Sequence, residues 1–200
     1  NSFEALSGLG RVELELHQPA EALSYFDKAV AIAPTDSMAL NGRAVALDQL
    51  GRNDEAQAVY LDILTREPSN MRVRNNYALS LALAGKFKDS TDILSGIAAA
   101  PDAEARMRQN LALVYGLAGN DGQAAHVARL DLDEEAVNNN LQYYQRLRDV
   151  HSPIERGGAL LNSSKEPDTR KSGASASAAK SRAEIARGLL DAGVIERLPE

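Results

Sequence analysis

The chain contains the segment Leu40-Asn41-Gly42-Arg43-Ala44-Val45-Ala46-Leu47-Asp48-Gln49-Leu50-Gly51, whose small residues and closing glycine return at a fixed interval. Gly51 is followed by Gly85 and then by Gly119, each 34 residues further along the chain. The same interval separates other identical residues: Ala22 and Ala56; Ala44, Ala78 and Ala112; Asn76 and Asn110; Pro34 and Pro68. A period of this length indicates one supersecondary unit that is copied along the chain. The interval predicts an architecture but leaves the bound partner open.

Each copy has the pattern of a pair of helices. Four blocks, 3–36, 37–70, 71–104 and 105–138, each begin with an apolar-periodic stretch, break near the middle and resume with a second stretch. In the second block, apolar side chains recur at spacings of three and four residues, at Leu40, Ala44 and Leu47 and then at Ala56, Tyr60 and Ile63. This spacing is typical of one buried helix face and not of a strand. We therefore expect an all-α fold.

Glycine, aspartate and proline stand where the helices of each pair should begin and end. The three glycines of the 34-residue interval fall where a left-handed residue ends the first helix. Asp54, Asp89 and Asp121 lie near the start of the second helix, where we expect their carboxylates to cap free amides. Pro34 and Pro68 close the second helix.

These residues resemble the tetratricopeptide repeat family. The first copy of the family pattern is Leu9-Gly10, Ala22, Phe26, Ala29 and Pro34, and the next blocks repeat it. The resemblance implies an α-solenoid of about four helix pairs, in which the first helix of each pair lines the concave surface. Ala44, Ala78 and Ala112 are small enough to let paired helices approach closely, as such a stack requires.

The repeat weakens after Ala124, and a further helix is predicted over about 134–150. We interpret this helix as a cap that covers the exposed end of the stack, so that the solenoid domain spans residues 1–150. Residues 151–180 are mostly small and charged, and we expect a largely disordered linker there. Residues 181–198 are interpreted either as a floppy tail or as a short amphipathic helix, begun by a Ser181–Glu184 capping box, that docks on the groove or on a partner.

Composition excludes several classes of function. The formal net charge is −6 and the pI is about 5.2, which argues against nucleic-acid binding through phosphate attraction. The chain has no cysteine and no apolar run long enough to cross a bilayer. Because it opens on Asn1, we expect that an upstream segment has been removed. Any export signal or lipid anchor would have been lost with it, and membrane attachment would depend on that anchor.

We expect no enzyme, no metal site, no cofactor and no small-molecule substrate. His17, His126 and His151 have no partner at a useful spacing, and no nucleotide-binding motif is present. The acidic run 131–135 lacks the glycine of a calcium loop, and we interpret it as a first helical turn whose carboxylates face the helix dipole.

A candidate partner site lies on the first helices of the third and fourth pairs. Arg72 and Asn76 are four residues apart, hence on one helix face, and Arg106 and Asn110 repeat them. Asn140 extends this row on the cap helix, and four leucines extend the strip: Leu79, Leu83, Leu113 and Leu117. Amide side chains suit the backbone of an extended peptide, and arginine suits a carboxylate. In the alternative interpretation, the asparagines only bridge neighbouring helices and the arginines are solvated.

Residues 105–148 carry a more specific similarity. Asn110-Leu111-Ala112-Leu113, Asn139-Asn140-Leu141 and Tyr143-Tyr144 look like the TadD family, tetratricopeptide proteins of the bacterial tight-adherence (Flp) pilus machinery. The resemblance implies a periplasmic lipoprotein, associated with the outer membrane, that assists pilus assembly and whose partner is the secretin or another pilus component. Two alternatives stay open at this point: a cytoplasmic chaperone-type adaptor, and the regulatory array of a larger enzyme.

Overall fold

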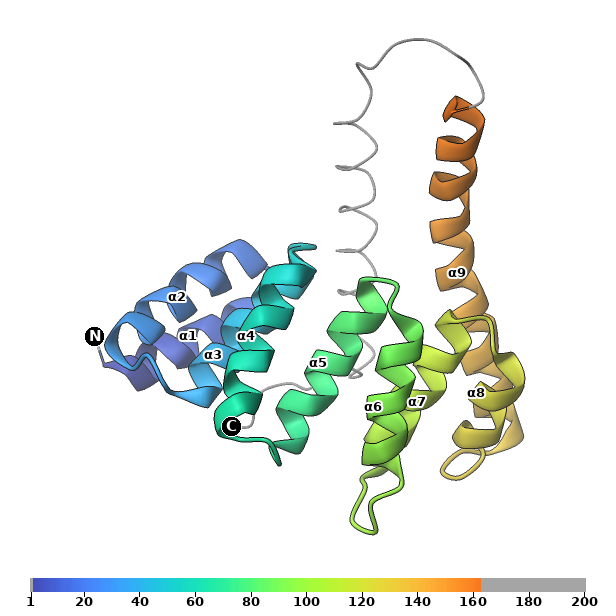
Figure 1. The fold of residues 1–200 in the computed structure, drawn as a ribbon, viewed down its shortest axis with the longest axis horizontal. Helices are drawn as coiled ribbons and strands as arrows, with labels where there is room; N and C mark the ends of the chain where they lie inside the picture. Colours follow the sequence, from blue (N-terminus) through green and yellow to red (C-terminus); the bar gives the residue numbers. More distant parts are fainter. Residues whose placement is uncertain (1, 163–200) are drawn as a thin grey trace.

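The computed structural model describes residues 2–162, and side chains up to Asp149. The linker expected up to residue 180 lies outside the described residues from 163 onward, as does the helix expected over 181–198. The described part of the chain is all helical (Figure 1): α1 Phe3–Glu15, α2 Pro19–Ile32, α3 Ser37–Gln49, α4 Asn53–Arg66, α5 Met71–Leu83, α6 Phe87–Ala98, α7 Ala105–Leu117, α8 Asp121–Ala128 and α9 Glu134–Asn162. None of these helices combines the length and apolarity that a membrane span requires.

The helices form a solenoid of four pairs followed by α9, which confirms the predicted fold class. Every helix from α1 to α8 packs on the next one in the chain, and Figure 1 shows the pairs side by side in an arc. The first helices of the pairs, α1, α3, α5 and α7, also contact one another in turn. Within the described residues no such contact joins α2, α4, α6 and α8. The first helices therefore line the inner, concave side of the arc.

The four hairpin turns share one backbone conformation. Gly51, Gly85 and Gly119 have φ values of 74°, 78° and 81°, as the left-handed helix end requires. His17 stands 34 residues before Gly51 and takes the same conformation, with a φ of 58°. In the first turn, the His17 N–H donates to the Leu14 carbonyl, as the Gly51 N–H donates to the Asp48 carbonyl in the second. The turn geometry is therefore kept even where glycine is not.

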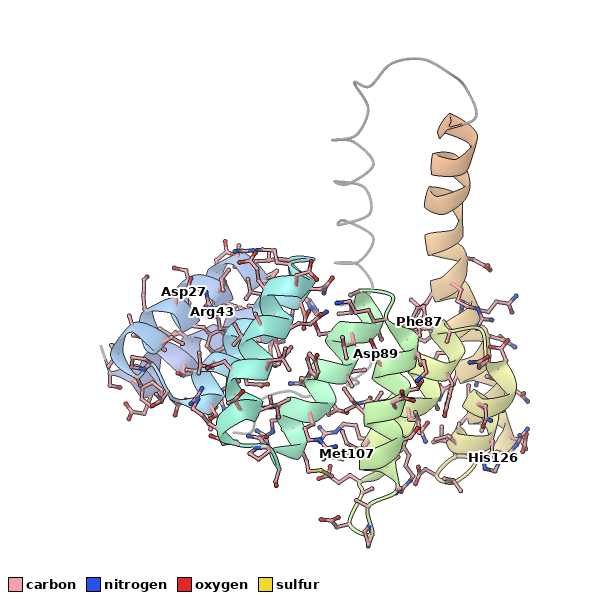
Figure 2. The ribbon with its side chains drawn as sticks, in the orientation of Figure 1. Asp27, Arg43, Phe87, Asp89, Met107 and His126 are labelled. Atoms are coloured by element: carbon pink, nitrogen blue, oxygen red, sulfur yellow. The ribbon has the colours of Figure 1, made fainter. Side chains whose placement is uncertain are left out.

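The predicted capping aspartates do not cap, which corrects the sequence interpretation. Asp54, Asp89 and Asp121 lie in the first turns of α4, α6 and α8, and no side-chain cap bond occurs at these helix starts (Asp89 is labelled in Figure 2). These positions are already inside the helix, so their carboxylates interact with the helix dipole and do not cap the first amides. The capping side chains stand instead before the first helices, and each accepts a backbone N–H: Ser2 from Ala5, Asp36 from Ala39 and Asn70 from Val73.

Small residues let aromatic rings enter between helices. A Cβ added to Gly42 would lie 2.3 Å from the Phe26 ring, and one added to Gly116 would lie 2.2 Å from the Tyr144 ring. Neither position has room for a side chain without movement of a buried ring. The alanines of the 34-residue interval are likewise buried completely.

An ion pair also joins the first two helix pairs. Arg43 of α3 points at Asp27 of α2, with Nε 2.7 Å from Oδ1 (Figure 2).

Helix α9 covers the end of the stack, as a cap was expected to do. Val137 and Tyr144 are buried against the core, and the Arg148 guanidinium lies 2.7 Å from Oδ1 of Asp121 on α8. The helix continues to Asn162, twelve residues past the predicted end at 150. The expected boundary followed a change of composition, whereas the helix continues through Pro153, Gly157 and Gly158, and nothing in the sequence explains why it does.

At the opposite end, α1 presents an apolar stripe to solvent, formed by Ala5, Leu9, Val12 and Leu16. Val12 is 50% exposed, whereas the residues at the same place in the later repeats, Ala46, Ser80 and Val114, are 0% exposed. In α3, α5 and α7 this face packs on the preceding helix pair. The stripe on α1 is therefore a stacking surface that no described helix covers.

Candidate partner-binding groove

A row of asparagines crosses the first helices of the second, third and fourth pairs. The Asn76 amide of α5 donates to Oδ1 of Asn41 on α3 at 3.1 Å, and the Asn110 amide of α7 donates to Oδ1 of Asn75 on α5 at 2.8 Å. The Asn75 amide donates to Oδ1 of Asn76 at 3.3 Å, so the four side chains form one continuous chain. All four are buried. The row therefore holds the first helices of three consecutive pairs, α3, α5 and α7, in register, as the bridging interpretation describes.

Each end of this row carries a polar atom without a partner. The Nδ2 atom of Asn41 and the Oδ1 atom of Asn110 are buried and make no hydrogen bond within the described part of the chain. A buried donor or acceptor that stays unpaired costs about 1–3 kcal/mol. The row thus holds an unsatisfied donor at one end and an unsatisfied acceptor at the other, both beneath the surface. Sequence reasoning found Asn76 and Asn110 but missed Asn41 and Asn75, whose place beside them follows from the 34-residue interval.

The other predicted site residues fall into two groups. Leu79, Leu83 and Leu113 are buried in the main core cluster, with Leu117 packed against it, so these leucines build the groove wall from behind. The other three predicted site residues are half-buried: Arg72, Arg106 and Asn140. Asn140 lies on α9 and makes no hydrogen bond with the asparagine row among the described residues.

A pocket of about 760 Å³ opens beside the Asn41 end of the row, between the α2–α3 and α4–α5 turns. The Ser37 hydroxyl and the Asn70 amide donate to the two oxygens of Glu67, at the pocket wall, and these bonds hold the pKa of that carboxyl below its usual range. Hydrogen-bonding and charged groups dominate the lining, with Arg72 as its cation: Ala33, Thr35, Asp36, Ser37, Met38, Asn41, Glu67, Asn70, Arg72 and Val73.

A second polar cluster lies inside the junction between the second and third pairs, and sequence reasoning missed it. Asp48 of α3 is 3% exposed. Its Oδ1 accepts from Nδ2 of Asn53 at 2.8 Å and from Oγ of Ser80 at 2.7 Å, and its Oδ2 accepts from the Tyr60 hydroxyl at 3.1 Å. Burial, opposed by these three donors, raises the pKa of Asp48 from 3.8 to about 7. Close by, the Gln57 amide donates to the Ser80 carbonyl.

The acidic run 131–135 is divided between two roles. Glu134 and Glu135 lie in the first turn of α9, as predicted, and the Asp133 carboxylate caps that helix by accepting from the Ala136 N–H. Asp131 lies before the helix and forms a two-pronged ion pair with Arg108 of α7, which lowers the pKa of the aspartate. No group of three or more metal-ligating side chains occurs in the residues that the structure describes.

Comparison with known proteins identifies the helix pair. The sequence model of the tetratricopeptide repeat matches residues 13–68, and a second model of the same repeat matches residues 41–105. The helix pairs within residues 13–105 match the tetratricopeptide repeat. Such repeats form scaffolds that bind other proteins, so the concave row lies on the face where a partner of a tetratricopeptide domain is expected.

Relatives and solved structures agree with this fold. An uncharacterized protein, y4yS, from Sinorhizobium fredii strain NGR234 is 42% identical over 53 residues, which are 26% of this chain and 29% of that protein. MamA (residues 41 to the end) from Desulfovibrio magneticus RS-1 superposes with a TM-score of 0.57 at 22% identity, over 82% of this chain and 97% of that one. A tetratricopeptide repeat protein from Parabacteroides merdae superposes with a TM-score of 0.58 at 16% identity, over 99% of this chain and 79% of that one.

Proposed function

We propose that this chain is a non-catalytic scaffold whose concave face binds an extended segment of a partner protein during assembly of a Flp/Tad-type pilus. The observation that carries the binding proposal is the concave face itself, where the buried asparagine row fixes the spacing of α3, α5 and α7, and where the half-buried Arg72 and Arg106 lie at corresponding places on α5 and α7. The unpaired Nδ2 of Asn41 and Oδ1 of Asn110 lie below this surface, so a bound segment reaches them only where the covering side chains move aside.

The roles of the predicted residues follow from their burial. Asn76 and Asn110 hold the first helices in register, so their contribution to binding is the rigid placement of the row ends. Arg72 of α5 and Arg106 of α7 stand at corresponding positions, 34 residues apart and half-buried. On this proposal each guanidinium turns to a carboxylate of the partner, and Arg106 exchanges its 3.1 Å pair with Glu104 for that contact. The pocket beside Asn41 takes one side chain of the bound segment.

The cellular part of the proposal is supported by the resemblance of residues 105–148 to TadD proteins. On this proposal the partner is the secretin or another component of the pilus machinery, and the natural protein is held at the periplasmic side of the outer membrane through a lipid anchor upstream of Asn1. The sequence that precedes Asn1 in the natural gene tests this directly. A signal peptide with a lipid-acceptor cysteine supports the placement, and a cytoplasmic start without one contradicts it.

The binding proposal is tested with a phage-displayed library of random linear peptides, selected on the immobilised chain. An enriched peptide should bind the wild type and lose at least tenfold in affinity for the Arg72→Glu/Arg106→Glu variant, since one lost charged hydrogen bond is worth about 1.5–3 kcal/mol. Lys88→Glu is the matched control, because it reverses a charge on α6, where the Lys88 side chain is 85% exposed. If no peptide is enriched, or if the wild type and the arginine variant bind the enriched peptide equally well, the proposal that the groove binds a partner segment is contradicted.

A further inference from the structure

We propose that the junction between the α3–α4 pair and α5 is a protonation-dependent joint, in which neutral Asp48 holds α5 against the preceding pair and ionised Asp48 loosens it. The inference concerns the conformation of the solenoid, and it holds whichever partner the concave face binds.

The carboxyl group of Asp48 sits where three helices meet. It belongs to α3, and two of its donors, Asn53 and Tyr60, lie at the start and in the middle of α4. The third donor, the Ser80 hydroxyl, belongs to α5 and is the direct link from Asp48 across the junction. Whatever changes the charge of this carboxyl therefore acts on the contact between neighbouring repeats.

No cation among the described residues forms an ion pair with this carboxyl. The nearest basic side chains in the surrounding turns are engaged elsewhere: Arg52 pairs with Glu55 at 2.7 Å, and the Lys86 amine donates to Oε1 of Gln57 at 2.9 Å and lies 4.0 Å from Asp54. From α4, Tyr60 is the titratable neighbour, and burial beside Asp48 raises its pKa well above 10, so it stays neutral. From α1 and α2, the hydrophobic cluster shared with α3 contributes Leu14, Ala22 and Phe26, and from α5 the ring centroid of Tyr77 lies 6.5 Å from that of Tyr60.

The two protonation states of Asp48 therefore differ in whether the junction contains a buried charge. The neutral acid places no charge in the junction, and its proton can be donated to the Tyr60 hydroxyl oxygen, 3.1 Å away, in which case that hydroxyl no longer donates to Asp48. The ionised form places a charge among buried groups with three neutral donors, and burial of a charge without a counter-ion favours any state that admits water. We place the response at the contact with α5 because the Ser80 donor belongs to the neighbouring pair, whereas Asn53 and Tyr60 belong to the same pair as Asp48. The Asn76–Asn41 bond crosses the same junction, so the loosening reaches the asparagine row.

The next junction along the chain supplies an internal reference. The residues 34 positions after Asp48, Asn53, Tyr60 and Ser80 are Ala82, Phe87, Leu94 and Val114, and none of them titrates (Phe87 is labelled in Figure 2). The proposal therefore confines the response to the contact of α5 with α3 and α4, and it predicts that α7 does not share it.

Hydrogen–deuterium exchange of the full chain tests the joint, with amide rates corrected for the intrinsic effect of pH. Between about pH 5 and about pH 8, the opening equilibrium of α5 amides should rise roughly tenfold or more, while that of α7 amides stays constant. Asp48→Asn should abolish the rise, because Asn keeps an acceptor for Asn53 and Ser80 and can donate to Tyr60 without titrating. Asp54→Asn is the matched control, since the Asp54 side chain is 95% exposed, and it should respond like the wild type.

Equal pH responses of α5 and α7, or an unchanged response in Asp48→Asn, would overturn the proposal. Should that variant fail to fold, carbon-13 NMR of the wild-type aspartate carboxyl groups decides instead. One aspartate should titrate near pH 7. If no aspartate titrates there, the proposed joint is refuted as well.

Discussion

The junction between the second and third helix pairs and the junction between the third and fourth are built on one backbone plan with opposite chemistry. In the first, Asp48, Asn53, Tyr60 and Ser80 form a buried hydrogen-bonded cluster. In the second, the same four positions carry apolar side chains and belong to a continuous hydrophobic core. Both junctions close behind a left-handed glycine and a buried alanine. The repeat therefore specifies the turns and the close approach of the helices, and it leaves the chemistry between repeats free to differ.

Transplanting the carboxyl group from one junction to the other should give the largest effect. Ala82→Asp places an acid at the position that corresponds to Asp48, but Phe87, Leu94 and Val114 offer it no donor. An ionised, unpaired carboxylate in that place should cost about 4 kcal/mol or more of unfolding free energy at neutral pH. Urea unfolding followed by circular dichroism measures the loss, and stability should recover as the pH falls. A loss below 1 kcal/mol would show that donors are not what makes the Asp48 site tolerable.

The second largest effect should be a difference between the two junctions in how the unfolding free energy depends on pH. The pKa of Asp48 is raised to about 7 in the folded state, from 3.8, so its stabilising contribution is complete below pH 3.8 and is lost as the pH rises to about 7. Between about pH 5 and pH 8 the wild type should lose about 3 kcal/mol more than Asp48→Asn. Urea unfolding of both proteins at the two pH values measures this difference. Parallel pH profiles would contradict it.

Removing the hydroxyl that links the two pairs should have a moderate effect. Ser80→Ala deprives Asp48 of its donor from α5 and should cost about 1–2 kcal/mol at pH 8, where the carboxyl is ionised. At about pH 5 the cost should be smaller, because the neutral acid depends less on its donors. Thermal unfolding at the two pH values tests the difference, and a cost that does not change with pH would argue against an ionising partner.

The smallest expected effect concerns the turns, where the repeats are alike. His17 occupies the left-handed conformation that glycine occupies in the three later turns. His17→Gly should raise the unfolding free energy by about 1 kcal/mol, because a left-handed conformation strains a residue that has a Cβ. Gly85→Ala is the reverse change in a turn where nothing lies within 4 Å of an added Cβ, so only backbone strain can act. It should destabilise by a similar amount. Chemical denaturation of both variants provides the measurement.

Much of the fold could be predicted from the sequence because the period fixes it. Glycine and small residues at a constant interval have few physical explanations, and the helix pairs, the left-handed turns and the cap all followed from them. The capping aspartates were predicted wrongly, since a position one or two residues inside a helix cannot be distinguished from its cap without the backbone. The end of α9 was also missed, because Pro153 and the glycines at 157 and 158 indicate a break that the helix does not make.

The site was less predictable. The interval placed Asn76 and Asn110 on one face, but their burial and their bonds to Asn41 and Asn75 depend on how closely α3, α5 and α7 approach. Asp48 was overlooked because one acid in a helix is ordinarily a solvated residue. A signal was nonetheless present, since Asp48 stands at a position where the preceding repeat has Leu14 and the next has Ala82. Comparing repeats position by position, and asking where polarity departs from the pattern, would have found the cluster.

The apolar stripe on α1 has a consequence for how the array comes apart. In a stack of repeats, each pair is stabilised by its own packing and by its contacts with its neighbours. Within residues 2–162 the last pair gains from α9, whereas the first pair leaves Leu9, Val12 and Leu16 in water even when folded. Detaching α1 and α2 therefore exposes less additional apolar surface than detaching any other pair. Unfolding of the solenoid should begin by fraying at α1 and proceed toward α9, so a protease acting under native conditions would remove the first hairpin before it cuts the later helix pairs.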